Sequence, residues 1–241
     1  MLDHKKLPNF KLSALICGAV FLCGSFHWFR TNGPDRSYDF ELSVILLFVL
    51  GLFARQMFER TRDRSPLETM THTLFGLLYV VWLSSFLLKI VYVTPRVGGQ
   101  VTGHFYVLYL ITITKFSDMG AYVVGSLIGR HKMIPHISPN KTWEGLAGAV
   151  LFSVIASYGL VWLLPTHLSA LNPLHAGILG VLLCLVAVLG DLGESILKRS
   201  TDVKDSGHLL PGIGGALDLI DSLLFTGPML YFYMRWFLGM H

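Results

Sequence analysis

Charged side chains are scarce in this sequence. Only 14% of the 241 residues are Asp, Glu, Lys or Arg and 53% are hydrophobic, whereas a soluble domain carries about 25% charged residues. This composition disfavours a soluble enzyme. No polar stretch is long enough to form a large water-soluble domain beside the membrane part, so such a domain is excluded. The basic residues form no stripe for nucleic acid. Cysteine is scarce too, and Cys17, Cys23 and Cys184 all lie in apolar runs, so no disulfide framework is expected.

Seven apolar stretches are long enough to cross a bilayer at about 20 residues per crossing. They cover residues 12–29, 42–58, 70–93, 105–129, 145–164, 175–197 and 217–238. The sequence therefore predicts an all-α, polytopic integral membrane bundle of about seven transmembrane helices. We expect residues 1–104 to form an amino-terminal group of membrane helices and residues 105–241 to form the membrane domain that carries the chemistry. The first stretch is expected to stay as an uncleaved helix.

The basic residues predict the orientation of these helices. Thirteen of the 19 Lys and Arg residues lie on one side of the predicted membrane: Lys5, Lys6, Lys11, Arg55, Arg60, Arg62, Arg64, Arg130, Lys132, Lys141, Lys198, Arg199 and Lys204. An excess of Lys and Arg marks the cytoplasmic side, so the amino terminus is predicted to be cytoplasmic. Lys89 lies within an apolar stretch and is expected to extend toward the outer interface. Gly76, Gly159 and Gly180 are expected at contacts between helices.

Acidic residues at membrane depth are costly and indicate function. Asp191, Glu194, Ser195 and Lys198 have helical spacing, so one helix face carries all four. Carboxylates and a hydroxyl are oxygen ligands suited to Mg²⁺. The alternative is a simple ion pair between Glu194 and Lys198 at the end of the helix.

A basic, glycine-rich loop follows this helix. It contains Lys204 and Asp205, and Gly214 and Gly215 permit a backbone that approaches phosphate closely. A glycine-rich turn without a ligand is the alternative. The next apolar stretch begins with Asp218 and Asp221, which share one helix face. Acids also favour helix amino termini for electrostatic reasons alone.

A second polar cluster spans the fourth and fifth apolar stretches. Asp118 lies in the fourth stretch, and Ser138, Asn140, Lys141 and Thr142 precede the fifth. Ser138 is expected to cap the fifth helix, with Pro139 in its first turn. Lys141 and Thr142 have no role in that helix start, and they face the same predicted cytoplasmic compartment as the glycine-rich loop.

These residues form a recognisable signature, Ser195-x-Leu197-Lys198-Arg199-x4-Lys204-Asp205-x-Gly207-x2-Leu210-Pro211-x-Ile213-Gly214-Gly215-x2-Asp218-x2-Asp221. It resembles the bacterial phosphatidate cytidylyltransferases, also called CDP-diacylglycerol synthases. The segments Ser117–Tyr122, Ser138–Gly145 and Gly190–Ser195 support the resemblance, which covers roughly 105–227. The sequence departs from the family pattern at Ile213, Ala216 and Leu219, where the family has His, a larger apolar residue and Arg.

The resemblance implies an enzyme of the cytoplasmic (inner) membrane, a homodimer, that converts CTP and phosphatidic acid to CDP-diacylglycerol and pyrophosphate with Mg²⁺, with a monovalent cation such as K⁺ as a further implication. It implies metal ligation by Asp191 and Asp218 with help from Ser195 and Asp221. Lys204 and Asp205 are further catalytic candidates. The substrate-binding candidates are Asp118, Ser138, Asn140, Lys141, Thr142, Lys198, Arg199, Gly214 and Gly215.

Two other functions are compatible with the same residues. A CTP-dependent lipid kinase of the polyprenol type would also need Mg²⁺ and a basic membrane site, but it would release CDP instead of pyrophosphate. An ion-coupled transporter would use Asp118, Asp191, Asp218 and Asp221 along an ion path. That function requires acids near the middle of the spans and does not require a basic loop on one face.

Overall fold

The computed structural model describes residues 10–32, 37–59, 65–93, 102–200 and 216–240. The helices are α1 (Lys11–Asn32), α2 (Ser37–Phe58), α3 (Pro66–Gly76), α4 (Leu83–Val93), α5 (Gly103–Ile128), α6 (Trp143–Leu163), α7 (Pro173–Ser200) and α8 (Ala216–Phe237). A π-helical segment, η1 (Leu77–Trp82), joins α3 and α4 into one continuous helix. Among the described residues the fold is all-α except for one short hairpin, as predicted.

Six helical stretches in the described part are long and apolar enough to cross a membrane, with α3, η1 and α4 counted together as Pro66–Val93. At a rise of 1.5 Å per residue, 21 to 28 residues suffice for the ~30 Å hydrocarbon core. The seventh predicted stretch forms α8, which is not among the six. The chain is a multi-pass membrane protein whose helices follow the predicted order.

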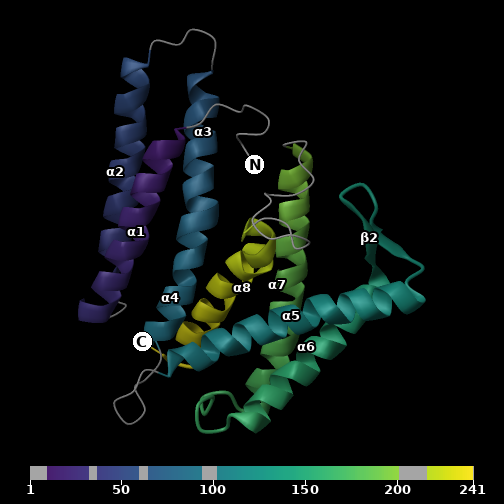
Figure 1. The fold of residues 1–241 in the computed structure, drawn as a ribbon. Coiled ribbons are helices and arrows are strands. Elements are labelled where there is room, and N and C mark those ends of the chain that lie inside the picture. Colours follow the sequence, from purple (N-terminus) through teal and green to yellow (C-terminus); the bar gives the residue numbers. More distant parts are fainter. Residues whose placement is uncertain (1–9, 33–36, 60–64, 94–101, 201–215, 241) are drawn as a thin grey trace.

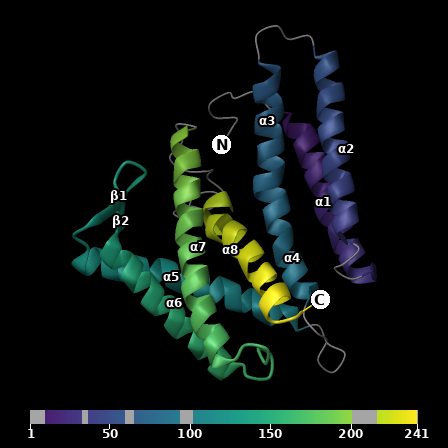
Figure 2. The same ribbon diagram turned by 180° about the vertical axis from the view of Figure 1, so that it is seen from behind.

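The helices form two groups that cross each other (Figure 1). In this view α1, α2 and α3–α4 stand side by side, and α7 and α8 stand next to them, whereas α5 and α6 run across the bundle as a pair. The view from behind shows the same arrangement (Figure 2). The crossing brings the far end of α5 and the start of α6 toward the ends of α7 and α8, where the charged residues lie.

Glycine allows α5 and α6 to approach closely. A Cβ atom on Gly120 would lie 2.5 Å from the backbone oxygen of Gly148, and one on Gly148 would lie 2.4 Å from the Cβ of Val124. Gly180 likewise contacts the backbone of α6, as expected. The expectation for Gly76 and Gly159 is wrong, because a Cβ on either one would meet no atom within 4 Å.

The main core joins α4 to the carboxyl-terminal helices. Its buried side chains come from α4, α5, α7 and α8 and from the turn after α6, among them Ile90, Tyr109, Leu183 and Tyr231. Hydrogen bonds between side chains also join helices within this core. Tyr109 and Ser157 share a hydrogen bond of 2.6 Å, and Ser157 also donates to the backbone oxygen of Ala176. The predicted boundary at residue 104 remains a prediction.

Lys89 does not extend to the outer interface as expected. Its side chain is only 1% exposed and forms an ion pair of 2.6 Å with Glu41 on α2. The ammonium nitrogen also lies 4.3 to 5.9 Å from the ring centroids of Tyr38, Phe86 and Tyr231. The Lys89 ammonium group is therefore stabilised by a carboxylate and by aromatic faces, and not by water at the membrane interface.

Candidate active site

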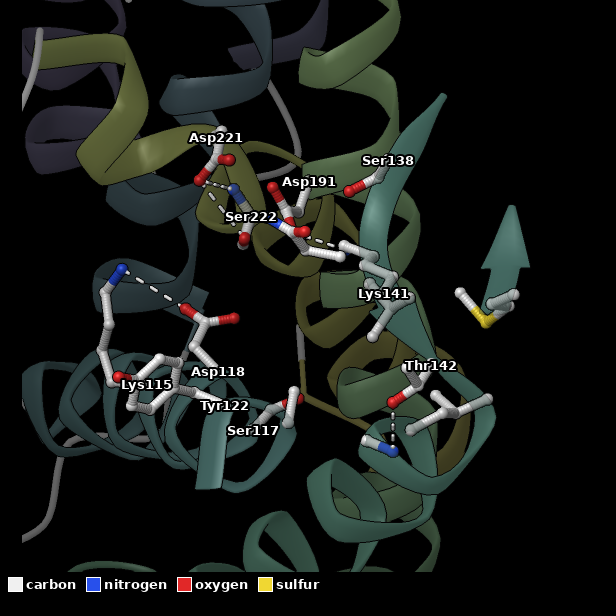
Figure 3. Close-up of a pocket in the computed structure, with 16 residues that line it drawn as sticks. Lys115, Ser117, Asp118, Tyr122, Ser138, Lys141, Thr142, Asp191, Asp221 and Ser222 are labelled. Carbon is white, nitrogen blue, oxygen red and sulfur yellow. Dashed lines mark hydrogen bonds and ion pairs between the residues drawn. The ribbon is translucent and has the colours of Figure 1, made fainter. Parts of the chain in front are cut away.

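A cavity of about 380 Å³ lies where α5, α6, α7 and α8 meet the hairpin. Figure 3 shows the side chains that converge on it. Its lining is Lys115, Ser117, Asp118, Ala121, Tyr122, Met133, Ser138, Asn140, Lys141, Thr142, Gly145, Leu146, Val188, Asp191, Asp221 and Ser222. The cavity combines acids, lysines and hydroxyl groups in a helical membrane protein, which is an arrangement suited to a charged ligand.

Three acids gather beside this cavity. Asp191 and Glu194 from α7 and Asp221 from α8 each offer a carboxylate oxygen, and the three oxygens lie within 4.8 Å of one another. Asp221 is buried, and its Oδ1 accepts hydrogen bonds from the backbone nitrogen and the hydroxyl of Ser222, at 2.6 and 3.2 Å. An all-oxygen donor set of this size fits a hard divalent cation such as Mg²⁺.

Two lysines bring positive charge to the cavity. Lys141, from strand β2, forms an ion pair with Asp191 of α7, and the two side chains meet across the cavity in Figure 3. Lys115 and Asp118 of α5 form a looser pair at 3.6 Å, with both side chains 44% exposed. Because the second pair is half-exposed, both of its charges remain accessible to a ligand.

The hairpin positions the polar residues before α6. Strands β1 (Lys132–Ile134) and β2 (Ser138–Thr142) pair in antiparallel fashion, with Lys132 opposite Thr142. Glu144 of α6 accepts hydrogen bonds from the backbone nitrogens of Arg130 and His131 and contacts the His131 ring at 2.5 Å. This carboxylate holds the start of the hairpin against the start of the helix.

Thr142, not Ser138, caps α6. The Thr142 hydroxyl accepts a hydrogen bond of 3.1 Å from the backbone nitrogen of Gly145. The predicted cap at Ser138 is wrong because residues 138–142 form a strand, which moves the helix start by four residues. The hydroxyl of Thr142, predicted to lie outside the helix start, is therefore part of it.

Seven of the predicted site residues line the cavity. They are Asp118, Ser138, Asn140, Lys141, Thr142, Asp191 and Asp221. Ser195 lies on α7 but does not line the cavity. Lys198 pairs with Glu194 at 2.9 Å, and Arg199 is exposed near the end of α7.

Several predicted residues lie outside the part that the structure describes. Lys204, Asp205, Gly214 and Gly215 are in the undescribed segment between α7 and α8. Asp218 belongs to α8, but its side chain is also outside the described residues. Their roles remain predictions.

The sequence-based site omitted four polar residues that the structure places in or beside the cavity. Lys115, Tyr122 and Ser222 line it, and Glu194 joins the acid cluster. For Glu194 the signal was present, since it lies three residues after Asp191 on the same face. It was considered as an oxygen ligand or as the partner of Lys198, but was left out of the predicted metal ligands, and the structure shows that it takes part in both groups.

The fold and the site define a polytopic helical membrane protein with an acid-and-lysine cavity between its helices. The chain matches the cytidylyltransferase family over residues 3–237 and belongs to that family. Membership implies nucleotide and lipid substrates in a membrane setting.

Curated relatives agree with this assignment. A phosphatidate cytidylyltransferase of Bacillus subtilis is 42% identical over 243 residues, covering 98% of this chain and 84% of the relative. One of Mycobacterium leprae is 38% identical over 217 residues, covering 87% of this chain and 66% of the relative. YnbB of Escherichia coli, an uncharacterised protein, is 39% identical over 164 residues, and the matched region spans only about half of its length (51%).

Proposed function

We propose that this protein transfers the cytidylyl group of CTP to phosphatidic acid, giving CDP-diacylglycerol and pyrophosphate for phospholipid biosynthesis. The similarity to phosphatidate cytidylyltransferases over 98% of the chain carries the proposal. The cavity supports it, because its acids and lysines are the groups that nucleotidyl transfer requires.

The reaction needs little proton transfer. A phosphatidate oxygen is already anionic at neutral pH, so it attacks the α-phosphorus of CTP directly. The new oxygen–phosphorus bond forms as the bond to the β-phosphate breaks, and the electron pair leaves with pyrophosphate. Positioning and charge stabilisation then supply most of the rate.

The cavity residues divide into two groups. Lys141 and Lys115 would bind the triphosphate, and the Ser138 and Asn140 side chains would offer hydrogen bonds beside them. Asp191, Glu194 and Asp221 would hold Mg²⁺, with Asp218 and Ser195 as further candidates. When bound, the metal supplies neutralisation of the phosphate charge.

The proposal includes a location and an assembly. The predicted excess of Lys and Arg on one side supports a site at the cytoplasmic face of the inner membrane, where CTP is available. A homodimer and a second, monovalent cation such as K⁺ complete the proposal, and both rest on the family resemblance alone.

An assay of the purified protein with phosphatidic acid and radiolabelled CTP tests the function. The expected products are CDP-diacylglycerol and pyrophosphate, formed only while Mg²⁺ is present. Asp191→Asn should lower kcat/KM by about 100-fold or more, because it removes one oxygen charge from the acid cluster.

Asp39→Asn is the matched control, since Asp39 is an exposed acid on α2 away from the cavity. It should leave turnover unchanged. Release of CDP without pyrophosphate would identify a lipid kinase instead. Normal turnover by Asp191→Asn would remove this acid from the site.

A further inference from the structure

A second cavity, of about 570 Å³, lies between the amino-terminal helices and the ends of α7 and α8. Its walls are almost entirely apolar. They are formed by Phe10, Lys11, Ala14, Leu15, Gly18, Ala19 and Leu22 at α1, by His72, Thr73, Phe75 and Gly76 of α3, by Leu77, Tyr79, Val80 and Val81 of η1, and by Leu197 and Leu217. We call it the η1 groove.

The η1 groove lies close to the acid cluster on both helices that carry the acids. Leu197 lies three residues after Glu194 on α7, and Leu217 lies four residues before Asp221 on α8. Each is therefore one helical turn from an acid, on about the same side of its helix. The apolar part of a molecule bound in the groove would therefore end about one helical turn from the acids.

Tyr79 lines the η1 groove and lies near the acid cluster. Its ring stacks on Phe75 at 5.4 Å and meets Phe225 of α8 edge-on at 6.1 Å, so both helices fix its position. The residue is 8% exposed, and within the described residues its buried hydroxyl has no hydrogen-bond partner. The charges of Glu194, Asp221 and Lys198 act on this hydroxyl.

A buried hydroxyl without a hydrogen-bond partner lowers the stability of the folded protein. Such a group in a protein calls for an explanation, and a bound ligand is one. The π-helical geometry of η1 adds to this observation, because π-helical turns within α-helices occur frequently at functional sites. A ligand with an oxygen-bearing head and an apolar tail would satisfy both the Tyr79 hydroxyl and the groove.

We infer that the η1 groove binds an acyl chain of the phosphatidic acid substrate and that the Tyr79 hydroxyl donates a hydrogen bond to an oxygen of its glycerol phosphate head. This inference rests on the proposed function and adds to it. It gives the amino-terminal helices a direct part in lipid binding. Tyr79 is a binding residue in this scheme and takes no part in bond making.

Gly76 allows the groove to be filled without a clash. It lines the groove, and a Cβ at this position would meet no atom within 4 Å. Gly76→Leu should therefore fill space that the acyl chain would occupy. Gly51→Leu on α2 is the matched control, because Gly51 is also an open helical glycine but is exposed and outside the groove.

The readout is the ratio of kcat/KM for dioleoyl-phosphatidic acid to that for dihexanoyl-phosphatidic acid, measured on the full-length protein in detergent. Gly76→Leu should lower this ratio about tenfold, since several buried methylenes lose their contacts. Gly51→Leu should leave it unchanged. Equal ratios in all three proteins would overturn the groove assignment and leave the proposed function standing.

Tyr79→Phe tests the hydroxyl separately. It should raise KM for phosphatidic acid about tenfold and leave KM for CTP unchanged. The thermal unfolding temperature should stay the same or rise slightly, because no hydrogen bond within the described protein is lost and an unpartnered buried hydroxyl is removed. A fall in the unfolding temperature with an unchanged KM for the lipid would indicate a structural role and contradict the inference.

A photolabelling experiment separates this inference from the proposed function. Phosphatidic acid with a diazirine in its acyl chain should label peptides of α1 and η1, and Gly76→Leu should abolish the labelling. That result in a protein that makes no CDP-diacylglycerol would keep the groove and reject the proposed function. Equal competition by phosphatidylcholine would show a general lipid site and reject the substrate assignment.

Discussion

At the scale of single residues, the charged side chains of the candidate site form ion pairs with one another. Asp191 and Lys141 are 50 positions apart in the chain, yet they form an ion pair across the cavity. Glu194 contacts Lys198 on its own helix and also belongs to the acid cluster. A charge at membrane depth is costly alone, and each of these side chains has an oppositely charged partner.

Lys89 and Glu41 show the same rule away from the site. Lys89→Met should destabilise the protein by about 3–5 kcal/mol, because it leaves the Glu41 carboxylate buried at 3% exposure without its counter-charge. Thermal unfolding in detergent micelles measures the change. The double variant Lys89→Met, Glu41→Leu should recover most of the stability. If the double variant is no more stable than the single one, the pair does not account for the loss.

At the scale of secondary structure, helix ends and close crossings position the site. The hairpin and α6 are joined by the Thr142 cap and by Glu144, and α6 in turn packs against α5 through Gly120 and Gly148. Movement of either helix would displace residues on both sides of the cavity.

Gly148→Ala tests the α5–α6 contact. The added methyl group would lie 2.4 Å from the Val124 Cβ and 2.7 Å from the Gly120 oxygen, so the helices must separate. We expect a loss of about 1–3 kcal/mol in stability and a raised KM for CTP, measured by thermal unfolding and steady-state kinetics.

The control for this contact is Gly159→Ala on the same helix, where the methyl group would meet no atom within 4 Å. It should be neutral or slightly stabilising, because alanine is favoured over glycine in helices by up to about 1 kcal/mol. Similar losses in both variants would attribute the effect to α6 itself and not to its contact with α5.

At the scale of the whole molecule, α5 and α6 run across the other helices (Figure 1). The hairpin, α7 and α8 thereby contribute to one cavity. The cavity draws on residues 115–222, while the η1 groove joins residues 10–81 to Leu197 and Leu217. The amino-terminal helices therefore do more than anchor the protein if the lipid occupies that groove.

Cysteine labelling tests the orientation in the membrane. In His136→Cys, the new thiol lies in the exposed hairpin, and in Ser169→Cys it lies in the exposed turn between α6 and α7. A membrane-impermeant maleimide should label the first only in inside-out vesicles and the second only in right-side-out vesicles. The unmodified chain, with its three cysteines in helices, is the background control. The reverse pattern would invert the predicted topology.

Much of the fold follows from the sequence because its signals are local. Long apolar runs predicted every membrane helix within a few residues, and the spacing of Asp191 and Glu194 predicted their common face. The start of α6 was misplaced because a strand and a helix cap compete for the same Ser and Thr residues. Pairing of Lys89 with Glu41 involves two separate helices, and no local pattern indicates it.

The sequence by itself determined that this protein lies in a membrane and that it is helical, and it predicted most of the acids and one of the two lysines that the structure brings to the candidate site. The scarcity of charge indicates that the surroundings are lipid and not water, and the helical period indicates which acids share one helix face. Only the tertiary structure decided which of these residues meet. Convergence of the hairpin, α7 and α8 depends on how helices cross, and the crossing is set by close contacts such as that between Gly120 and Gly148. The η1 groove arises in the same way, from surfaces that are adjacent only after the helices have packed.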